Sequence, residues 1–280
     1  MAGIEQHPGE VLGVMSDSRR FNGSLGLGKL LESVGWSRVL EYAYAVSLLR
    51  ASAGGALLDV GTGRHSIFPL FCAWRFGVRA IASDLDAESL ARQRRWAQRA
   101  GMCGEASRGG LETERVDARA VPHPDGSLDC VSAISSIEHI PGDGDSTAVR
   151  EAHRVLRPGG AFVCTVPFDG AAQEHAEMHR KRSAYDRDYK GQPVFFQHVY
   201  CWDSLRSRIL EAAPFKDWEV ILLGRERGGL TEFWQRHVPF RNTLKYLLGW
   251  ALTRDAMHGF RLARHEPWDR AIIAVCRLNK

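Results

Sequence analysis

The chain of 280 residues is 44% hydrophobic, which is enough for a well-buried core in one large or two small domains. Its formal net charge of +4 is small, and acidic and basic residues are mixed along most of the chain, so nothing indicates a nucleic-acid partner. The cysteines stand singly without a C-x-x-C pair, and no apolar run reaches the roughly 20 residues of a membrane span. The N-terminus lacks the apolar segment of a signal peptide, so we expect a cytoplasmic protein.

An N-terminal segment, residues 1–55, contains an apolar pattern at 35–50 that predicts a helix packed beside the first strand. From residue 56 to residue 280, short apolar runs alternate with helical patterns, which predicts a parallel sheet in an α/β domain. The expected strands are residues 56–60, 78–84, 111–117, 128–134, 161–168, 217–224 and 270–278.

Helix start and stop signals follow the first two strands. Ser66 and Pro69 stand where the first of these helices would begin, and Gly77 stands where it would end. After the second strand, Asp86 is placed to cap a helix that Gly101 ends. These signals agree with an alternation of strands and helices.

A glycine turn, within LLDVGTGRHS (57–66), places Gly61 and Gly63 where the first strand ends. Without Cβ atoms, these residues allow a tight turn and let a ligand contact the backbone, while the next helix offers unpaired N–H groups. Ligands of open parallel sheets bind at such turns, beyond the carboxyl ends of the strands. A plain tight turn is the alternative, because G-x-G alone is a weak motif.

Carboxylates near this turn favour an adenosine-containing ligand. Asp84 ends the second strand about 20 residues after the glycines, where a carboxylate can accept hydrogen bonds from both ribose hydroxyls; the alternative is that it only starts the turn before Asp86. Asp117 ends the third strand and could accept a hydrogen bond from an adenine amino group. Asp59 would repel the pyrophosphate of a dinucleotide but attract the sulfonium and ammonium groups of S-adenosylmethionine.

Residues 56–168 resemble the class I S-adenosylmethionine-dependent methyltransferase family, in the branch that methylates many small molecules. The matching motifs are LLDVGTGRHS, AIASDLD, RVDARAVPHPDGSLDCVSAISSIEHI and EAHRVLRPGGAFVCTVPF. His65 stands where the family commonly has a third glycine. The resemblance implies a Rossmann-like, doubly wound α/β sheet of seven strands whose last strand is antiparallel, with helical cover insertions.

The resemblance also implies which residues contact S-adenosylmethionine. They are Asp59, Gly61, Thr62, Gly63, Asp84, Leu85, Asp117, Ala118, Ser135 and Ser136. Gly61 and Gly63 would line the methionine part, Asp84 would hold the ribose, and Asp117 with Ala118 would bind adenine. The two serines after the fourth strand would face the reacting end.

Two histidines are candidates for a general base. Methyl transfer is an in-line displacement that needs the acceptor's lone pair about 3 Å from the methyl group. If the acceptor is a hydroxyl, a base must also take its proton, and histidine suits that role. His139, just past the fourth strand, is the first candidate and His198 the second; for each, the alternative is a histidine that only hydrogen-bonds its loop.

No metal site is expected. His175 and His179 are spaced to share one helical face, but EHAEMH lacks the glutamate directly after the first histidine that a zinc-protease helix requires. A polar stretch that covers the substrate is the preferred interpretation.

Two insertions, at about 169–202 and 225–267, are predicted to cover an acceptor with a sizeable apolar part. Their aromatic residues include Phe195, Phe196, Tyr200, Trp234, Tyr246 and Trp250. The second insertion places basic residues beside an apolar helical stripe, so it also suits an interfacial helix on anionic lipid and an amphiphilic or lipid-linked acceptor.

The leading function is therefore methyl transfer from S-adenosylmethionine to an oxygen or nitrogen of a small-molecule acceptor. A nucleotide-dependent oxidoreductase is the first alternative, which Asp59 and the later motifs disfavour. The second is a non-catalytic descendant that binds the cofactor or a partner. Neither the acceptor nor an oligomeric state is readable from the pattern, because specificity belongs to the N-terminal segment and the insertions.

Overall fold

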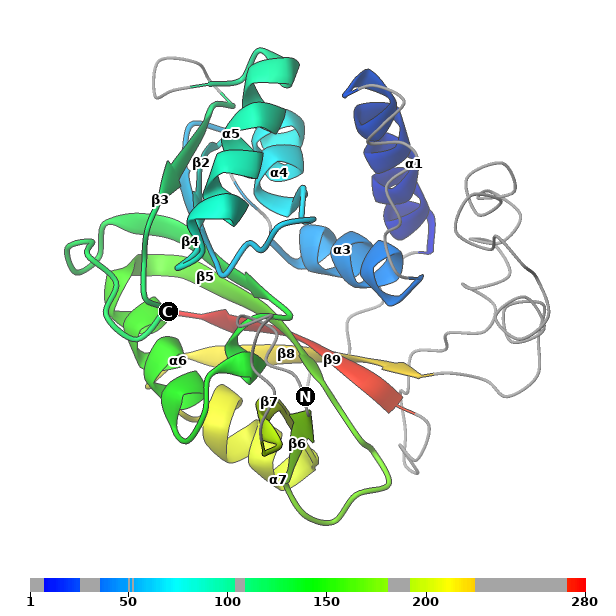
Figure 1. The fold of residues 1–280 in the computed structure, drawn as a ribbon, viewed down its shortest axis with the longest axis vertical. Helices are drawn as coiled ribbons and strands as arrows, with labels where there is room; N and C mark the ends of the chain where they lie inside the picture. Colours follow the sequence, from blue (N-terminus) through cyan, green and yellow to red (C-terminus); the bar gives the residue numbers. More distant parts are fainter. Residues whose placement is uncertain are drawn as a thin grey trace.

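The predicted strands form one sheet. The computed structural model describes residues 8–25, 36–49, 51, 53–103, 109–180, 192–224 and 271–280 (Figure 1). Within these residues, the strands of the seven-stranded sheet are, in chain order, β1 (Ala56–Val60), β2 (Arg79–Ser83), β3 (Leu111–Glu114), β4 (Leu128–Ile134), β5 (Leu156–Pro167), β8 (Asp217–Gly224) and β9 (Ala271–Asn279).

The strand order is β3-β2-β1-β4-β5-β9-β8. Neighbours from β3 to β5 pair in parallel, whereas β9 runs antiparallel to both β5 and β8. The doubly wound sheet with an antiparallel last strand is therefore confirmed. The chain reverses its direction of winding between β1 and β4, and ligands of such sheets bind beyond the carboxyl ends of the strands at that point.

Helices cover both faces of this sheet (Figure 1). One face carries α1 (Pro8–Ser24), α3 (Trp36–Leu49), α4 (Phe68–Phe76) and α5 (Ala87–Ala100). The other carries α6 (Gly144–Val155), α7 (Trp202–Leu205) and the helical turn η2 (Arg206–Leu210). Successive strand residues point to opposite faces, so Leu57 joins the core of the first face and Leu58 that of the second.

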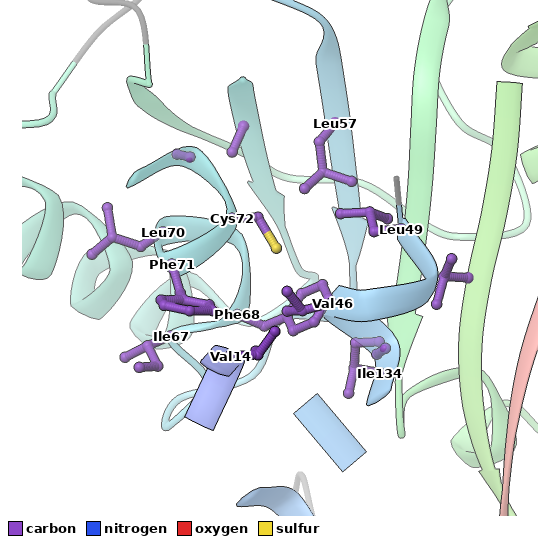
Figure 2. Packing of buried hydrophobic residues seen from close by; sticks show 14 of the residues in the cluster. Val14, Val46, Leu49, Leu57, Ile67, Phe68, Leu70, Phe71, Cys72 and Ile134 are labelled. Carbon is purple, nitrogen blue, oxygen red and sulfur yellow. The ribbon is translucent and has the colours of Figure 1, made fainter. Parts of the chain in front are cut away.

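The first face is closed by apolar side chains from helices on either side of β1. Figure 2 shows Val46 of α3 beside Phe68 of α4, and Leu49 of α3 beside Leu57 of β1, with Phe71 of α4 in the same buried cluster. Each of these side chains is almost completely buried. Burial of one such side chain contributes about 1.5–3 kcal/mol, so this cluster fixes how α3 and α4 lie against the sheet.

Three helix signals act as predicted, at Asp86, Gly101 and Gly77, whereas Ser66 does not occupy the cap position of α4. The Asp86 carboxylate caps α5 by accepting hydrogen bonds from the backbone of the first turn, and Gly101 ends the helix at φ 66°. Gly77 ends α4 at φ 67°, a left-handed conformation that glycine adopts without strain. The Ser66 hydroxyl accepts a hydrogen bond from the Phe68 N–H, although Ile67 occupies the cap position itself.

The N-terminal helix α3 packs near the first strand, because its Val46 and Leu49 belong to the same buried cluster as Leu57 of β1. It also extends over β4, β5 and β9, whereas α4 contacts β1 and β2. As a result, α3 reaches the carboxyl ends of the strands on the other side of the β1/β4 switch point.

The described part of the first insertion is a β-hairpin, so a helical cover there was wrong. β6 (Ala176–Arg180) pairs antiparallel with β7 (Val194–Val199) on the α6 side of the sheet (Figure 1). Because β6 is exposed along its length, its sequence shows no apolar alternation from which a strand could be predicted. His179 therefore lies on a strand and shares no helix with His175.

The second insertion, 225–267, lies outside the described residues. The predictions of a cover helix and of a lipid-facing helix there concern these residues, which include Trp234, Tyr246 and Trp250. Across the ranges that the structure describes, no helix combines the length and the apolar character needed to cross a bilayer.

Candidate active site

The two glycines of the β1 turn have different reasons to be glycine. Both have positive φ, 68° at Gly61 and 72° at Gly63. A Cβ on Gly61 would lie 2.7 Å from the Cβ of Ser136, so a side chain there would displace the turn after β4. A Cβ on Gly63 would meet no atom within 4 Å, so this side of the turn is open to a ligand.

Asp59 supports the turn from inside the protein. Its side chain is buried, and its carboxylate accepts hydrogen bonds from the Ser132 hydroxyl at 2.6 Å and the Thr62 hydroxyl at 2.8 Å. Burial raises the pKa of Asp59 to about 7, and the negative charge of Asp84 adds a smaller increase. The hydrogen bonds from Ser132 and Thr62 lower the pKa but do not cancel the effect of burial. A ligand on the open side of the turn would sense Asp59 through its electric field rather than by direct contact.

Asp84 joins the ends of β1 and β2. One carboxylate oxygen accepts a hydrogen bond from the Gly63 N–H at 2.8 Å, and the other accepts one from the Asp86 N–H at 2.8 Å. Asp84 does start the turn before Asp86, as the alternative proposed, but it also braces the glycine turn. A carboxylate has about four lone-pair positions, so two are left for hydroxyl donors. Leu85, the next residue, is 53% exposed.

Asp117 and Ala118 lie beyond β3. Arg119 forms a bidentate ion pair with Asp117: its Nε lies 3.0 Å from Oδ1 and its Nη2 lies 2.7 Å from Oδ2. Hydrogen bonds from Arg119 hold the pKa of Asp117 below its ordinary value, so this group is a carboxylate near neutral pH. Ala118 is buried next to it. The rim thus carries one charged acceptor beside a small apolar surface.

The turn after β4 is strained. Among the described residues, Ser135 is the one non-glycine residue with positive φ, at 45°. Its N–H donates to the Thr165 carbonyl at 3.1 Å and to the Thr165 hydroxyl at 2.9 Å. The Ser136 hydroxyl donates to the Val60 carbonyl at 2.8 Å. Such backbone strain costs about 1–3 kcal/mol and is common at functional sites.

A buried carboxylate from α3 completes this turn, and sequence reasoning missed it. Glu41 is 1% exposed and accepts hydrogen bonds from the hydroxyls of Ser135 and Thr165. The available signal was an acidic residue within the otherwise apolar run of the predicted helix. Since buried charges are retained only with partners, that position indicates a polar site beneath the helix.

The candidate bases occupy different surroundings. His139 ends the short helical turn η1 (Ile137–His139), its side chain is 19% exposed, and its Nδ1 lies 2.7 Å from the Phe196 carbonyl. His198 is buried, with Nε2 3.0 Å from the Ile140 carbonyl and Nδ1 3.0 Å from Nε2 of His175. Both ring nitrogens of His198 therefore contact protein groups.

A third buried carboxylate anchors the β6–β7 hairpin to α6. Asp145 accepts a hydrogen bond from the Tyr200 hydroxyl at 2.7 Å and two from the Arg208 guanidinium at 2.7 and 2.9 Å. Burial, aided by the charge of Asp145, raises the pKa of Tyr200, so the phenol keeps its proton and donates. In the part of the chain that the structure describes, no three His, Cys, Asp or Glu side chains group as metal ligands would.

Comparison with known proteins agrees with this geometry. Residues 58–164 match a family described as "Methyltransferase domain". The 27-O-demethylrifamycin SV methyltransferase of Amycolatopsis mediterranei (strain S699) is 32% identical over 142 residues, which are 48% of this chain and 48% of the relative. A ubiquinone/menaquinone biosynthesis C-methyltransferase of Hahella chejuensis (strain KCTC 2396) is 28% identical over 141 residues, 50% of each chain. The chain thus spans about half the length of these curated relatives.

A solved structure shares the overall fold. The crystal structure of the cyclase SpnF superposes with a TM-score of 0.56 at 20% identity, covering 88% of this chain and 84% of that one. At this identity the likeness concerns the fold. Residues 58–164 thus match a methyltransferase domain, and the strand order and the glycine turn are those that the resemblance to class I S-adenosylmethionine-dependent methyltransferases implies.

Proposed function

We propose that the chain transfers a methyl group from S-adenosylmethionine to an oxygen or nitrogen atom of a small-molecule acceptor. One observation carries this proposal: the β1 turn, open at Gly63 and braced by Asp84, contacts the strained Ser135–Ser136 turn at the switch point of the sheet. In this proposal the glycine turn holds the cofactor and the Ser135–Ser136 turn faces the reacting end, and their contact supports it because methyl transfer requires the two to be adjacent.

The residues present fit the cofactor. Gly63 leaves the turn open, and Asp84 keeps lone pairs for the two ribose hydroxyls. Asp117 is charged and can accept from an adenine amino group, with the exposed apolar side chain of Leu85 on the same rim. When bound, S-adenosylmethionine supplies a methyl group made electrophilic by its sulfonium. In its ionised form, which burial confines to pH values above about 7, Asp59 favours that positive charge over the pyrophosphate of a dinucleotide.

His139 is the base we propose for a hydroxyl acceptor. It lies close behind the Ser135–Ser136 turn, and its backbone N–H donates a hydrogen bond to the Ser136 carbonyl at 3.1 Å. This bond fixes the His139 backbone to the turn. A base in this position takes the acceptor's proton and typically contributes 10²–10⁴-fold in rate. His198 is a weaker candidate, because its buried ring already contacts Ile140 and His175.

We propose an acceptor with a sizeable apolar part, covered by segments 169–202 and 225–267. The described half of this cover, the β6–β7 hairpin, contacts η1, where His139 lies. The rifamycin relative is named for an oxygen acceptor and the quinone relative for a carbon acceptor, so carbon methylation is the second candidate. Hydrogen exchange tests the cover: protection of both segments should rise only when acceptor is added to the cofactor-product complex.

The direct test is mass spectrometry of candidate acceptors incubated with the full chain and S-adenosylmethionine. A gain of one methyl group supports the proposal, and the position of the label separates oxygen, nitrogen and carbon acceptors. Calorimetry with S-adenosylmethionine, its demethylated product and NAD is the companion experiment. Saturable NAD binding without binding of either adenosyl compound would overturn the proposal in favour of an oxidoreductase.

A further inference from the structure

The β6–β7 hairpin contains a β-bulge at the residue that contacts His139. Met178 pairs with Gln197 and His179 pairs with Phe195, so the register of the hairpin skips Phe196. A bulge adds one residue to one strand and turns its backbone groups away from the ladder, and such bulges are over-represented next to active sites. Here the Phe196 carbonyl lies 2.7 Å from Nδ1 of His139, across 57 positions of sequence.

This contact determines which nitrogen of His139 exchanges protons. A carbonyl oxygen can only accept a hydrogen bond, so Nδ1 must carry its hydrogen in both the neutral and the protonated ring. Protonation and deprotonation of the ring therefore take place at Nε2. The Phe196 ring also packs edge-on against the imidazole, with centroids 4.9 Å apart, which limits rotation of the ring.

Further bonds hold the hairpin in place beside η1. His198 on β7 contacts the Ile140 carbonyl at 3.0 Å, one residue beyond His139. The Tyr200 N–H donates to the Pro167 carbonyl at 3.1 Å, and the Tyr200 hydroxyl reaches buried Asp145. These bonds fix the C-terminal end of β7, and the Phe196 carbonyl with it. Rotation of the His139 ring would therefore break its contact with this carbonyl.

Two charged groups of the described residues lie beside this contact. On η1, Oε1 of Glu138 lies 3.7 Å from Nε2 of His139, on the side of the ring opposite the hairpin carbonyl. On β6, the guanidinium of Arg180 stacks over the Phe196 ring at 3.3 Å from its centroid. Neither group competes for Nδ1, which the carbonyl occupies.

We propose that the β6–β7 hairpin is the positioning element of the base: the bulged Phe196 carbonyl holds the Nδ1 hydrogen of His139, so that Nε2 receives the acceptor's proton. This inference rests on the proposed function for the identity of the reaction, but its geometry concerns the chain alone. The proton leaves the acceptor's hydroxyl, ends on Nε2 and passes to water before the next turnover. Phe196 acts through His139 and is not itself a catalytic residue.

Nitrogen-15 NMR of the full chain without cofactor is the test. In the neutral His139 ring, the parent should show a protonated Nδ1 and an unprotonated Nε2, with the signals assigned by their loss in His139→Ala. Deletion of Phe196 removes the bulge and should convert His139 to a mixture of both tautomers. Met178→Leu changes the neighbouring pair but keeps the bulge, so it should keep the parent's tautomer.

Kinetics supply the second readout once an acceptor is known. Deletion of Phe196 should lower kcat about tenfold or more with cofactor affinity unchanged, whereas Met178→Leu should stay within about twofold of the parent. A parent spectrum with hydrogen on Nε2, or a Phe196 deletion that keeps the parent's tautomer, would overturn the inference. If the deletion variant does not fold, the parent spectrum decides by itself. Failure to find methyl transfer with a correct tautomer would count against the proposed function and not against the hairpin contact.

Discussion

Glu41 accepts a hydrogen bond from the Ser135 hydroxyl at 2.5 Å, which joins the N-terminal segment to the strained turn after β4. The two residues come from elements 94 positions apart. Because Glu41 also accepts from the Thr165 hydroxyl on β5, one buried carboxylate holds both strand ends beneath α3. Helix α3 is therefore attached to the turn after β4 and does not merely precede the sheet.

Removing the Glu41 carboxylate should destabilise the fold. In Glu41→Ala the buried hydroxyls of Ser135 and Thr165 lose their acceptor, and an unsatisfied buried polar group costs about 1–3 kcal/mol. Glu41→Gln keeps an accepting oxygen and should cost less. The free energy of unfolding from urea titration measures both variants. An alanine variant as stable as the parent would mean that the two hydroxyls find other acceptors and that Glu41 does not hold the turn.

Asp59 should make the stability depend on pH. Its pKa is about 7 in the folded chain against an ordinary value of 3.8, so between these values the folded state binds the proton more tightly than the unfolded state does. The stabilisation is complete below about pH 4 and is lost as the pH rises to about 7, at about 1.4 kcal/mol for each unit of pKa difference.

The measurement is the difference in unfolding free energy between the parent and Asp59→Asn across that range, because the difference removes the contributions of other titrating groups. The parent should lose stability relative to the variant as the pH rises. A constant difference from pH 4 to pH 7 would show that Asp59 is already ionised in the folded state.

Asp84→Ala should weaken binding of S-adenosylmethionine by about 1.5–3 kcal/mol, the usual scale for a hydrogen bond to a charged group. The variant also loses the brace to the Gly63 N–H, so circular dichroism must first establish that it folds. Asp125→Ala is a suitable control, because Asp125 is a 79% exposed carboxylate paired with Arg154. Calorimetry that finds equal affinity for parent and Asp84→Ala would leave Asp84 with only its turn-forming role.

His139→Ala should lower the turnover rate about 10²-fold or more on a hydroxyl acceptor while cofactor affinity stays nearly unchanged. His179→Ala is the matched control, since this histidine is 45% exposed and lies on the hairpin without contact to η1 in the bonds described above. Steady-state kinetics and calorimetry separate the two effects. A His139→Ala enzyme at full rate would leave proximity, or His198, to account for the chemistry.

Local patterns were enough to predict the sheet and the first half of the site. Apolar runs and turn residues act on their immediate neighbours, so the strand positions, the Asp86 cap and the ends at Gly77 and Gly101 could be inferred without a structure. The glycine turn and Asp84 belong to the same class, because a strand end and a fixed spacing locate them.

Long-range packing decided the remainder. Three hydrogen bonds join segments distant in sequence. They link Ser132 to Asp59, Ser135 to Glu41, and His139 to the Phe196 carbonyl. No periodicity encodes these contacts, because each depends on which face of the sheet an element covers and on the register it takes there. The hairpin is the clearest case: exposed β6 shows no apolar alternation, and only its pairing with β7 creates the bulge that turns one carbonyl toward the candidate base.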